Sequence, residues 1–356
     1  MLKMYGKKTV LTACVSLFLI LPMLSAMTAS ASPYVVGVKI GDWAGYGDIF
    51  LEWESNIPGQ EEPPPEFSNM SWADMKVLDI FDGNITVRST TIYKNGTERI
   101  DVTSGNITSG EGELSVSIIP SNLGAGDEIP ANLTWYTEEP LKLVINGTIT
   151  RNYANANREV NYVNITLPVI YGTMNMSFYW DKNTGILCEE IYSYVVSFTS
   201  NSKEYYMSML MMFRMTATNM WPAVFPIDWN GYIFNATMIS NSSISSFNFT
   251  QAEMEISFNV TGPAGKAGYC NVTIPKDMLQ GSPWTVLLNG TDWTTLCTIT
   301  ENDTHTFIHI PYTHSTNTIQ IRGTWVIPEF PPAMILPLLM IATTVSAILF
   351  RRRRKT

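Results

Sequence analysis

The sequence predicts an all-β protein: a large curved antiparallel sheet domain over residues 32–220, followed by an immunoglobulin-like β-sandwich over residues 231–326. Helical periodicity is nearly absent, and short runs rich in Val, Ile, Thr, Tyr and Phe alternate with turn-forming residues. Because these runs continue over about 300 residues, more than one ordinary core is expected. Pro222 and Pro226 break the strand pattern, so we expect a linker at residues 221–230.

Turn-forming dipeptides divide the first domain into hairpins. Residues 82–83 are Asp-Gly and residues 95–96 are Asn-Gly, and both pairs supply the positive φ angles that tight hairpin turns need. They predict a meander over residues 75–102. A further strand is expected over residues 113–119, where Pro120 ends the run. The other expected hairpin loops lie at residues 146–147 and 181–185.

The last strand of the first domain has the sharpest alternation. Every second position carries a large apolar side chain: Tyr205, Met207, Met209, Met211, Phe213 and Met215. This pattern is typical of an ordinary core strand. It also fits a wall that holds a lipid or another apolar ligand, since methionine packs around irregular shapes. On the second interpretation the domain is similar, by shape alone, to the lipoprotein-carrier architecture.

The first 31 residues have the three parts of a secretory signal peptide. Three lysines precede residue 9, an apolar run follows over residues 10–27, and Ala29-Ser30-Ala31 supplies an A-x-A cleavage site. We expect Ser32 to begin the mature chain; the alternative is an uncleaved anchor.

The C-terminal end has the composition of a transmembrane helix. Residues 331–350 carry no charge, and about 20 residues cross a hydrocarbon core ~30 Å thick as a helix. A basic cluster follows, and cations collect on the cytoplasmic side of a membrane. The predicted stop-transfer residues are Arg351, Arg352, Arg353, Arg354 and Lys355.

A short motif precedes this apolar run: Pro328, Glu329, Phe330 and Pro331. Motif, apolar run and basic tail together resemble the archaeal PEF-type C-terminal sorting signal. The resemblance implies an archaeal cell-surface protein that an archaeosortase processes. Processing would replace the span with a lipid anchor. Without it, the chain would stay a single-pass membrane protein, extracellular except for its cytoplasmic C-terminus.

The charge distribution excludes nucleic acid as a partner. All 31 acidic residues lie between Asp42 and Glu329, whereas eight of the 22 basic residues lie in the two end segments. The interior therefore has 14 basic residues against 31 acidic ones. Such a surface repels phosphate backbones.

Asparagine is concentrated in N-glycosylation sequons. Of the 26 Asn, 15 lie in N-x-[ST], whereas random placement would give about five. The excess predicts a glycoprotein and an oligosaccharyltransferase as its processing enzyme, although Asn-Gly-Thr is also a good turn sequence at Asn95 and Asn289. The acceptor candidates are Asn69, Asn84, Asn95, Asn106, Asn132, Asn146, Asn164, Asn175, Asn235, Asn241, Asn248, Asn259, Asn271, Asn289 and Asn302.

Three cysteines remain after the signal peptide. Cys270 and Cys297 fall in neighbouring predicted strands of the second domain, so we expect a disulfide between them. Cys188 is left over, and its state is open between a buried thiol and a link to another chain.

All three histidines occur within ten residues of one another. On a strand His305 and His309 point to the same face, and Asp303 would join them. Zinc needs three or four ligands at one point, and this spacing matches no zinc motif. We therefore expect surface or structural roles for His305, His309 and His314, and no metal site.

No P-loop, G-x-S-x-G elbow or H-E-x-x-H motif is present, so we expect neither catalysis nor a cofactor. The sequence favours a non-catalytic structural, adhesive or binding role in the cell envelope, with other envelope or S-layer components as partners. A carrier or sensor of an apolar ligand is the first alternative. A metal-dependent surface hydrolase is the second.

Overall fold

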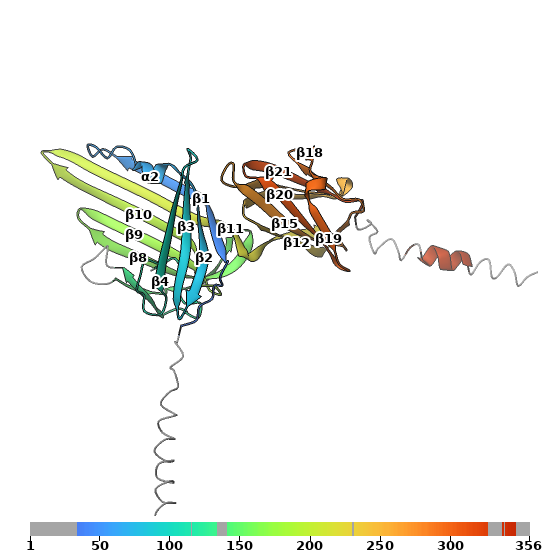
Figure 1. The fold of residues 1–356 in the computed structure, drawn as a ribbon, viewed down its shortest axis with the longest axis horizontal. Coiled ribbons are helices and arrows are strands. Elements are labelled where there is room, and N and C mark those ends of the chain that lie inside the picture. Colours follow the sequence, from blue (N-terminus) through green and yellow to red (C-terminus); the bar gives the residue numbers. More distant parts are fainter. Residues whose placement is uncertain are drawn as a thin grey trace, which may run out of the picture. The chain divides into compact units, whose positions relative to one another are not determined.

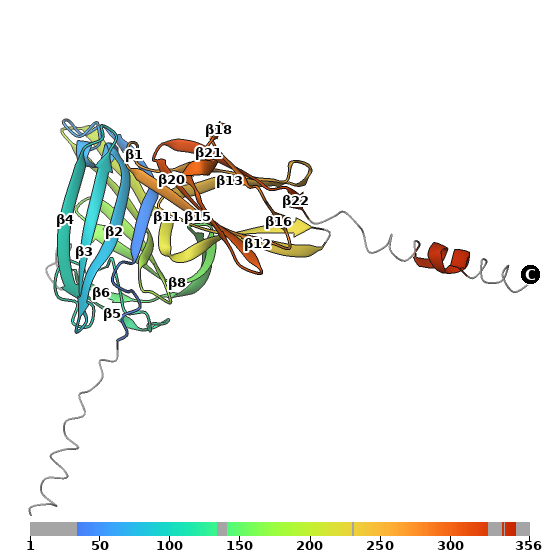
Figure 2. The same ribbon diagram turned by 45° about the vertical axis from the view of Figure 1, so that its right-hand side comes forward.

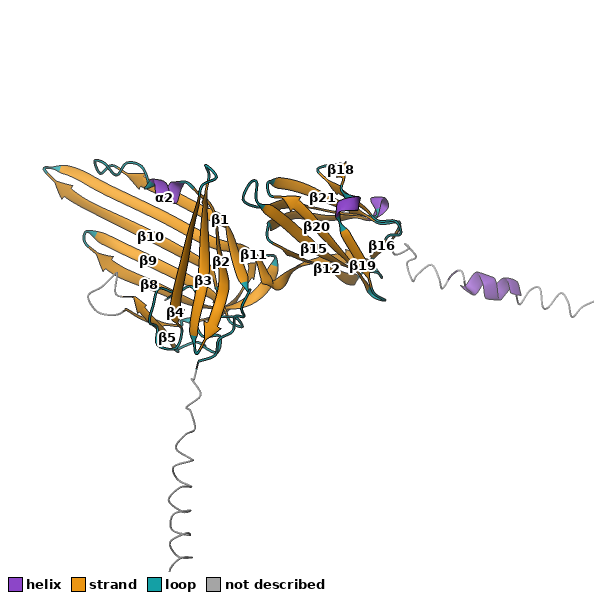
Figure 3. Cartoon of the chain, in the orientation of Figure 1, coloured by secondary structure: helices purple, strands orange, loops and turns teal. Residues whose placement is uncertain are grey.

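A computed structural model describes residues 34–114, 116–133, 141–229, 231–326, 337 and 339–346. Nearly all of them are in strands or in the turns between strands (Figures 1 and 3), which confirms the all-β class. From Val36 onward the chain forms one compact unit. The predicted signal peptide, the motif Pro328–Pro331 and the basic cluster Arg351–Lys355 lie outside the described residues.

The predicted span is described only at residues 337 and 339–346, which are helical. Within the described part of the chain, no helix combines the length and apolar composition that crossing a membrane requires.

In chain order the elements are β1 (Trp43–Ser55), α2 (Pro65–Ser68), β2 (Met70–Phe81), β3 (Asn84–Tyr93), β4 (Glu98–Asn106), β5 (Glu128–Leu133), β6 (Leu141–Val144), β7 (Gly147–Tyr153), β8 (Ala156–Val169), β9 (Gly172–Asp181), β10 (Leu187–Ser200), β11 (Lys203–Trp229), β12 (Tyr232–Ser240), β13 (Ser243–Thr250), β14 (Glu255–Thr261), β15 (Ala267–Pro275), β16 (Leu279–Gln280), β17 (Thr285–Leu288), β18 (Thr291–Asp292), β19 (Thr298–Glu301), β20 (His305–Thr313), β21 (Thr316–Arg322) and β22 (Trp325–Val326). Two short 3₁₀ turns, at Gln251–Glu253 and Thr294–Leu296, interrupt the strands.

Strand β11 is the branch point of the largest sheet. Its first half pairs with β1 on one side and with β10 on the other, and β10 leads on through β9 and β8 to β7. Its second half pairs with β12, which continues through β15 and β20 to β19. On the other side, β1 continues through β2 and β3 to β4. One strand of 27 residues thus belongs to both halves of the sheet.

The predicted linker at residues 221–230 is wrong as a break in the strand pattern, because β11 runs on to Trp229. The prolines are tolerated for local reasons. Pro222 lies in an irregular stretch of the β11–β12 register, between Thr218 and Ala223. Both Pro222 and Pro226 are exposed, and proline is compatible with strands at such irregular or outward positions. The division into two domains at this point stays a prediction.

The expected hairpins are confirmed at three of the Gly-containing turns and wrong at a fourth. Gly96, with φ 83°, lies in the Asn95-Gly96 turn between the paired strands β3 and β4. Asp82 and Gly83 have φ angles of 47° and 76° between β2 and β3, as the type I′ turn requires. Gly185, with φ 72°, closes the β9–β10 hairpin. The Asn146-Gly147 dipeptide joins two strands that do not pair with each other: β6 pairs with β5, and β7 with β8. The strand expected over residues 113–119 is wrong: residues 113, 114, 116 and 117 form turns, and Ile118 makes only an isolated bridge with Ile186.

Residues after β11 form a β-sandwich (Figure 2). The sheet β13-β14-β21-β17-β18 packs against the strands β12, β15, β20 and β19. Apolar side chains of both layers meet in one core, among them Phe258 and Ile319 of one sheet and Val272 and Ile308 of the other, each at most 1% exposed. The β-sandwich predicted for this part of the chain is therefore confirmed; the immunoglobulin-like topology stays a prediction.

Candidate ligand-binding face

Only the inner end of the apolar row on β11 belongs to a core. Met215 is 1% exposed and packs in a cluster with Tyr46 and Met75. The other five predicted ligand-binding residues are half-buried: Tyr205, Met207, Met209, Met211 and Phe213. The row therefore leaves the core at Phe213 and continues along a partly exposed face of the sheet.

The strand register extends this row into a surface across five strands. Residues that lie directly opposite each other in antiparallel strands point to the same face. Phe213 and Met211 are opposite Ile49 and Leu51 of β1, and Met211 is also opposite Tyr192 of β10. We call the resulting surface the apolar face. Its members are Ile49, Leu51 and Trp53 of β1; Tyr205, Met207, Met209, Met211 and Phe213 of β11; Tyr192, Tyr194, Val196 and Phe198 of β10; Met174, Met176 and Phe178 of β9; and Val163, Ile165 and Leu167 of β8.

Aromatic rings on the apolar face pack against one another. Phe198 and Tyr205 stack with their ring centroids 5.3 Å apart, and Tyr192 meets Phe178 edge-to-face at 5.9 Å. Such pairs hold the side chains in place at the two ends of the face. The methionines between them, Met207 and Met209, are unbranched and adaptable. The face therefore has fixed ends and a deformable middle.

The opposite side of the same strands is mixed, with apolar residues such as Ile191 of β10 and Met212 of β11 among polar ones. It presents Glu52 of β1, Ser193 of β10 and Asn175 of β9, among other residues. Both sequon asparagines of this part of the sheet, Asn164 and Asn175, lie on this side and are exposed. Sequence alternation has thus separated the apolar face from the positions where glycans would be attached.

A cavity of about 260 Å³ lies at the inner end of the apolar face. Tyr46 of β1, Met75 of β2, Leu187 and Glu190 of β10 and Phe213 of β11 contribute to its wall. Glu190 is opposite both Phe213 and Phe178, so its side chain belongs to the apolar face. It is the acidic member of an otherwise apolar or aromatic row on β10.

Burial raises the pKa of the Glu190 carboxyl to about 7, against the smaller opposing effect of a hydrogen bond from Tyr192. The Tyr192 hydroxyl donates to Glu190 Oε2 at 3.3 Å, a long contact. No Lys, Arg or His is among the described residues that line this cavity. Glu190 therefore has no cation beside it among the described residues of the cavity, whose wall combines apolar side chains with hydroxyl groups such as those of Thr90 and Ser117. A buried carboxyl group of this kind is typical of binding or catalytic positions.

The neighbouring carboxylates are fully engaged in the structure of the sheet. Asp181 accepts hydrogen bonds from Arg158 Nε at 2.7 Å and from the backbone N–H of Thr184 at 2.9 Å. Glu189 accepts from Arg151 and from the hydroxyl of Tyr153, at 2.5 and 2.6 Å. These contacts fix the closed end of the sheet, whereas Glu190 and Asp74 line the cavity.

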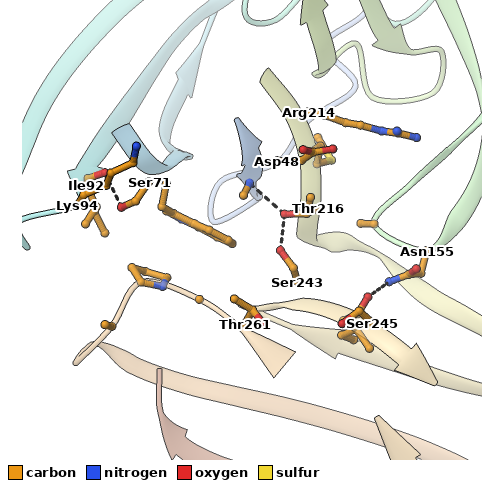
Figure 4. A pocket seen from close by; sticks show the side chains of 18 of the residues that line it. Asp48, Ser71, Ile92, Lys94, Asn155, Arg214, Thr216, Ser243, Ser245 and Thr261 are labelled. Carbon is orange, nitrogen blue, oxygen red and sulfur yellow. Dashed lines mark hydrogen bonds between the residues drawn. The ribbon is translucent and has the colours of Figure 1, made fainter. Parts of the chain in front are cut away.

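A separate, polar groove of about 710 Å³ lies where β1 and β11 approach β13 (Figure 4). Two of its hydroxyl groups bond to each other. The Ser243 hydroxyl donates to Thr216 Oγ1 at 2.6 Å, and Thr216 Oγ1 also accepts from the backbone N–H of Gly47 at 3.0 Å. Asp48 and Arg214 lie opposite each other in the β1–β11 register, and Lys94 adds a second positive charge to the wall. The described wall contains no His or Cys.

The structure places the three histidines in different surroundings. His309 is exposed, and its Nδ1 lies 2.7 Å from Asn271 Oδ1; His305 Nδ1 lies 2.8 Å from the hydroxyl of Thr304. His314 is buried, and its Nε2 lies 3.1 Å from Asn241 Oδ1. Among the described residues, no three His, Cys, Asp or Glu side chains gather as metal ligands would.

The disulfide predicted between Cys270 and Cys297 is wrong: both are free thiols, as is Cys188. The register gives the reason. Cys270 of β15 is opposite Ile310 of β20, and the β19–β20 register carried back one residue places Cys297 beside the same Ile310, on its other side. Two strand spacings are roughly 9.6 Å, beyond the ~7 Å that a disulfide spans. Cys188 is fully buried, and burial raises the pKa of its thiol.

The sequon asparagines lie at accessible positions. Side chains are described for 14 of them, and none is buried; the buried asparagines in the described residues, Asn161 and Asn317, are both outside sequons. Asn95 and Asn106 also accept hydrogen bonds from the Thr two residues later, as expected for Asx turns. Turn formation and accessibility thus coincide at these sites.

No family model and no curated protein matches the sequence. Among solved structures, the chain is similar to MucB in the crystal structure of MucB in complex with MucA(peri), with 11% identity and a TM-score of 0.24 over 76% of this chain and 87% of that chain. It is also similar to the complex structure of Pseudomonas aeruginosa MucA/MucB, with 10% identity and a TM-score of 0.20 over 78% of this chain and 88% of that chain. These TM-scores are too low to assign a partner or an activity.

Proposed function

We propose that this chain is a non-catalytic binding protein of the cell surface, and that it holds a long-chain lipid on the apolar face. One observation carries the proposal: an apolar surface that continues across five strands, in which Met207, Met209 and Met211 are only partly buried, whereas Met176 and Phe178 of β9 are buried. Large contiguous apolar surfaces on proteins usually mark sites of interaction. The cavity beside Glu190 and Phe213 gives this surface a closed inner end.

The size of the face fits an extended lipid tail. From Tyr205 to Phe213 the strand spans about 26 Å at ~3.3 Å per residue, whereas half of a bilayer's hydrocarbon core is about 15 Å thick. Methionine side chains suit such a ligand, because they adapt to a flexible chain. A rigid apolar peptide would be better served by fixed pockets.

The proposed location rests on the sequence. A signal peptide over residues 1–31, an uncharged run over residues 331–350 and the basic cluster at residues 351–355 support secretion with a C-terminal anchor. The motif Pro328–Pro331 and the 15 sequons support a glycosylated archaeal surface protein. A protein anchored in this way would meet lipid at the membrane that displays it.

Photolabelling tests the proposal on the full chain in lipid nanodiscs. A neutral long-chain alkane with a diazirine in its tail should label peptides that contain Tyr205–Phe213 and their neighbours on β1 and β10. Met209→Asp places a charge in the middle of the apolar face and should abolish this labelling, because a carboxylate is strongly disfavoured beside a hydrocarbon chain.

Met212→Asp is the matched control, because Met212 lies on the same strand and points to the opposite side. It should leave the labelling unchanged. The proposal fails if the alkane labels only residues 331–350 in the wild-type chain, or if Met209→Asp and Met212→Asp reduce labelling equally. Unfolding of the sheet by Met209→Asp, seen as loss of its circular dichroism, would favour an ordinary core role for this row.

A further inference from the structure

The inner end of the apolar face has a chemistry of its own, set by Glu190. The residues opposite it, Phe213 of β11 and Phe178 of β9, are apolar, and its neighbour on the same face of β10 is Tyr192. A ligand tail that follows the apolar face inward from Tyr205 would therefore end at this carboxyl group. Binding of a hydrocarbon tail alone does not require a carboxyl group at this position.

No Lys, Arg or His in the described part of the chain pairs with Glu190. Tyr192 donates a long hydrogen bond, and the Tyr46 hydroxyl, which lines the same cavity, donates to the backbone carbonyl of Leu187 instead. Asp74 of β2 also lines the cavity, but it adds negative charge and is stabilised by Thr90 and Arg88 on its own side. A carboxyl group in such a place is complemented best by a cation that donates hydrogen bonds.

We propose that Glu190 recognises the head group of the bound lipid, and that this head group is an ammonium group. The ligand would be a long-chain amine, with its nitrogen at the Glu190 carboxylate and its tail along Met211, Met209 and Met207. This inference rests on the proposed function, because it assumes that the apolar face holds a lipid tail. It adds a prediction of selectivity: a fatty acid or lipid phosphate of equal tail length is repelled by Glu190.

Two photoreactive probes with identical diazirine tails, a dodecylamine and a dodecanoate, test the selectivity on the full chain in nanodiscs of zwitterionic lipid. Labelling of peptides that contain Tyr205–Phe213 is quantified by mass spectrometry at matched probe concentrations. We expect the amine to half-saturate labelling at about one tenth of the concentration that the carboxylate needs, as a charge-assisted hydrogen bond implies. Glu190→Gln should bring the two probes to within about twofold of each other.

Glu52→Gln is the matched control: it removes the same charge from β1, on the exposed opposite side of the sheet. It should keep the preference for the amine. A second measurement needs no variant. A preference that came from the net negative charge of the protein would vanish as salt rises from about 0.1 to 1 M, whereas one set inside the cavity persists.

The outcomes separate the two proposals. If neither probe, nor the neutral alkane, labels the apolar face, the proposed function fails. If the alkane and both probes label it but the amine has no preference, or if Glu190→Gln keeps the full preference, the head-group assignment is overturned and the lipid-binding face stands. Loss of the wild-type preference at high salt overturns it as well.

Discussion

The sandwich and the apolar face are both built from strands whose side chains alternate between two faces of a sheet. The two regions nevertheless bury their apolar side chains to different extents. In the sandwich, Phe258 and Ile319 are at most 1% exposed because a second sheet covers them. On the apolar face, Met209 and Met211 have the same alternation and are half-buried. Period-two alternation therefore tells which side chains share a face of a sheet. Whether another layer covers that face depends on strands far away in the sequence.

The sharpest way to test this difference is a pair of truncations. Phe258→Ala removes a fully packed ring from the sandwich and should lower the free energy of unfolding by about 3–5 kcal/mol. Met211→Ala removes a half-exposed side chain and should cost about 1 kcal/mol, because less apolar area leaves its packed surroundings. Urea denaturation of the full chain measures both.

Val195→Ala gives the baseline for a side chain of the same sheet that is 48% exposed on the opposite side, with an expected change of at most about 0.5 kcal/mol. Losses of equal size for Phe258→Ala and Met211→Ala would mean that the apolar face is an ordinary core, and the comparison would fail.

The stability of the protein should depend on pH in opposite directions through His314 of the sandwich and Glu190 of the apolar face. In the sandwich, burial lowers the pKa of His314 from its ordinary 6.5 to about 4. The unfolded chain therefore takes up the proton first, and stability is lost as pH falls from about 6.5 to 4, by up to about 3 kcal/mol. At the apolar face, the raised pKa of Glu190 has the opposite consequence: stability is full below about 4.5 and is lost as pH rises through 7.

Denaturation midpoints of wild type, His314→Gln and Glu190→Gln between about pH 4 and 8 check both signs. Relative to wild type, the midpoint of His314→Gln should no longer fall at the acidic end of the range. The midpoint of Glu190→Gln should no longer fall at the neutral end. His309→Gln is the control for histidine content, because His309 is exposed. Identical pH profiles for all four chains would contradict the assigned burial of both groups.

Local signals in the sequence predicted much of the sheet and little of its layering. The alternation from Tyr205 to Met215 and the turn at Asp82-Gly83 were sufficient, because side-chain parity and positive φ are local properties. No strand was predicted before residue 75, so β1 was missed. It contains Gly45 and Gly47, and glycine is uncommon inside strands. Their lack of a side chain makes room for Trp72, whose ring atoms lie within 2.6 Å of where either Cβ would stand.

Only part of the candidate site could be predicted from the sequence, because its exposure depends on strands that are distant in the sequence. The row on β11 could be predicted as one face, but its exposure depends on β1, β8, β9 and β10 joining it. Glu190 could have been found, since it shares its parity with Tyr192, Tyr194 and Phe198. The Cys270–Cys297 pairing failed because sequence order places two cysteines in neighbouring strands without showing that β20 lies between them.

The smallest expected effect is a difference in glycan occupancy between a sequon on the sheet that carries the apolar face and a sequon in the sandwich. Asn175 is exposed on the polar side of β9, and within the described structure its Nδ2 makes no hydrogen bond, so a glycan can be attached without disturbing the sheet. Asn241 of the sandwich is held on both sides: its Nδ2 donates to the carbonyl of Ala267 at 2.9 Å, and its Oδ1 accepts from the backbone N–H of Tyr269 at 2.8 Å. Mass spectrometry of glycopeptides should find Asn175 occupied and Asn241 bare.

Substitution to glutamine tests the cause of that difference. Asn175→Gln should remove one glycan mass and leave the denaturation midpoint unchanged. Asn241→Gln should leave the glycan mass unchanged and destabilise the sandwich by about 1–3 kcal/mol, because the longer side chain cannot keep both backbone partners and leaves His314 without its contact. A glycan on Asn241 would show that this turn opens before or during modification, and that the sandwich is less firmly closed than its buried core implies.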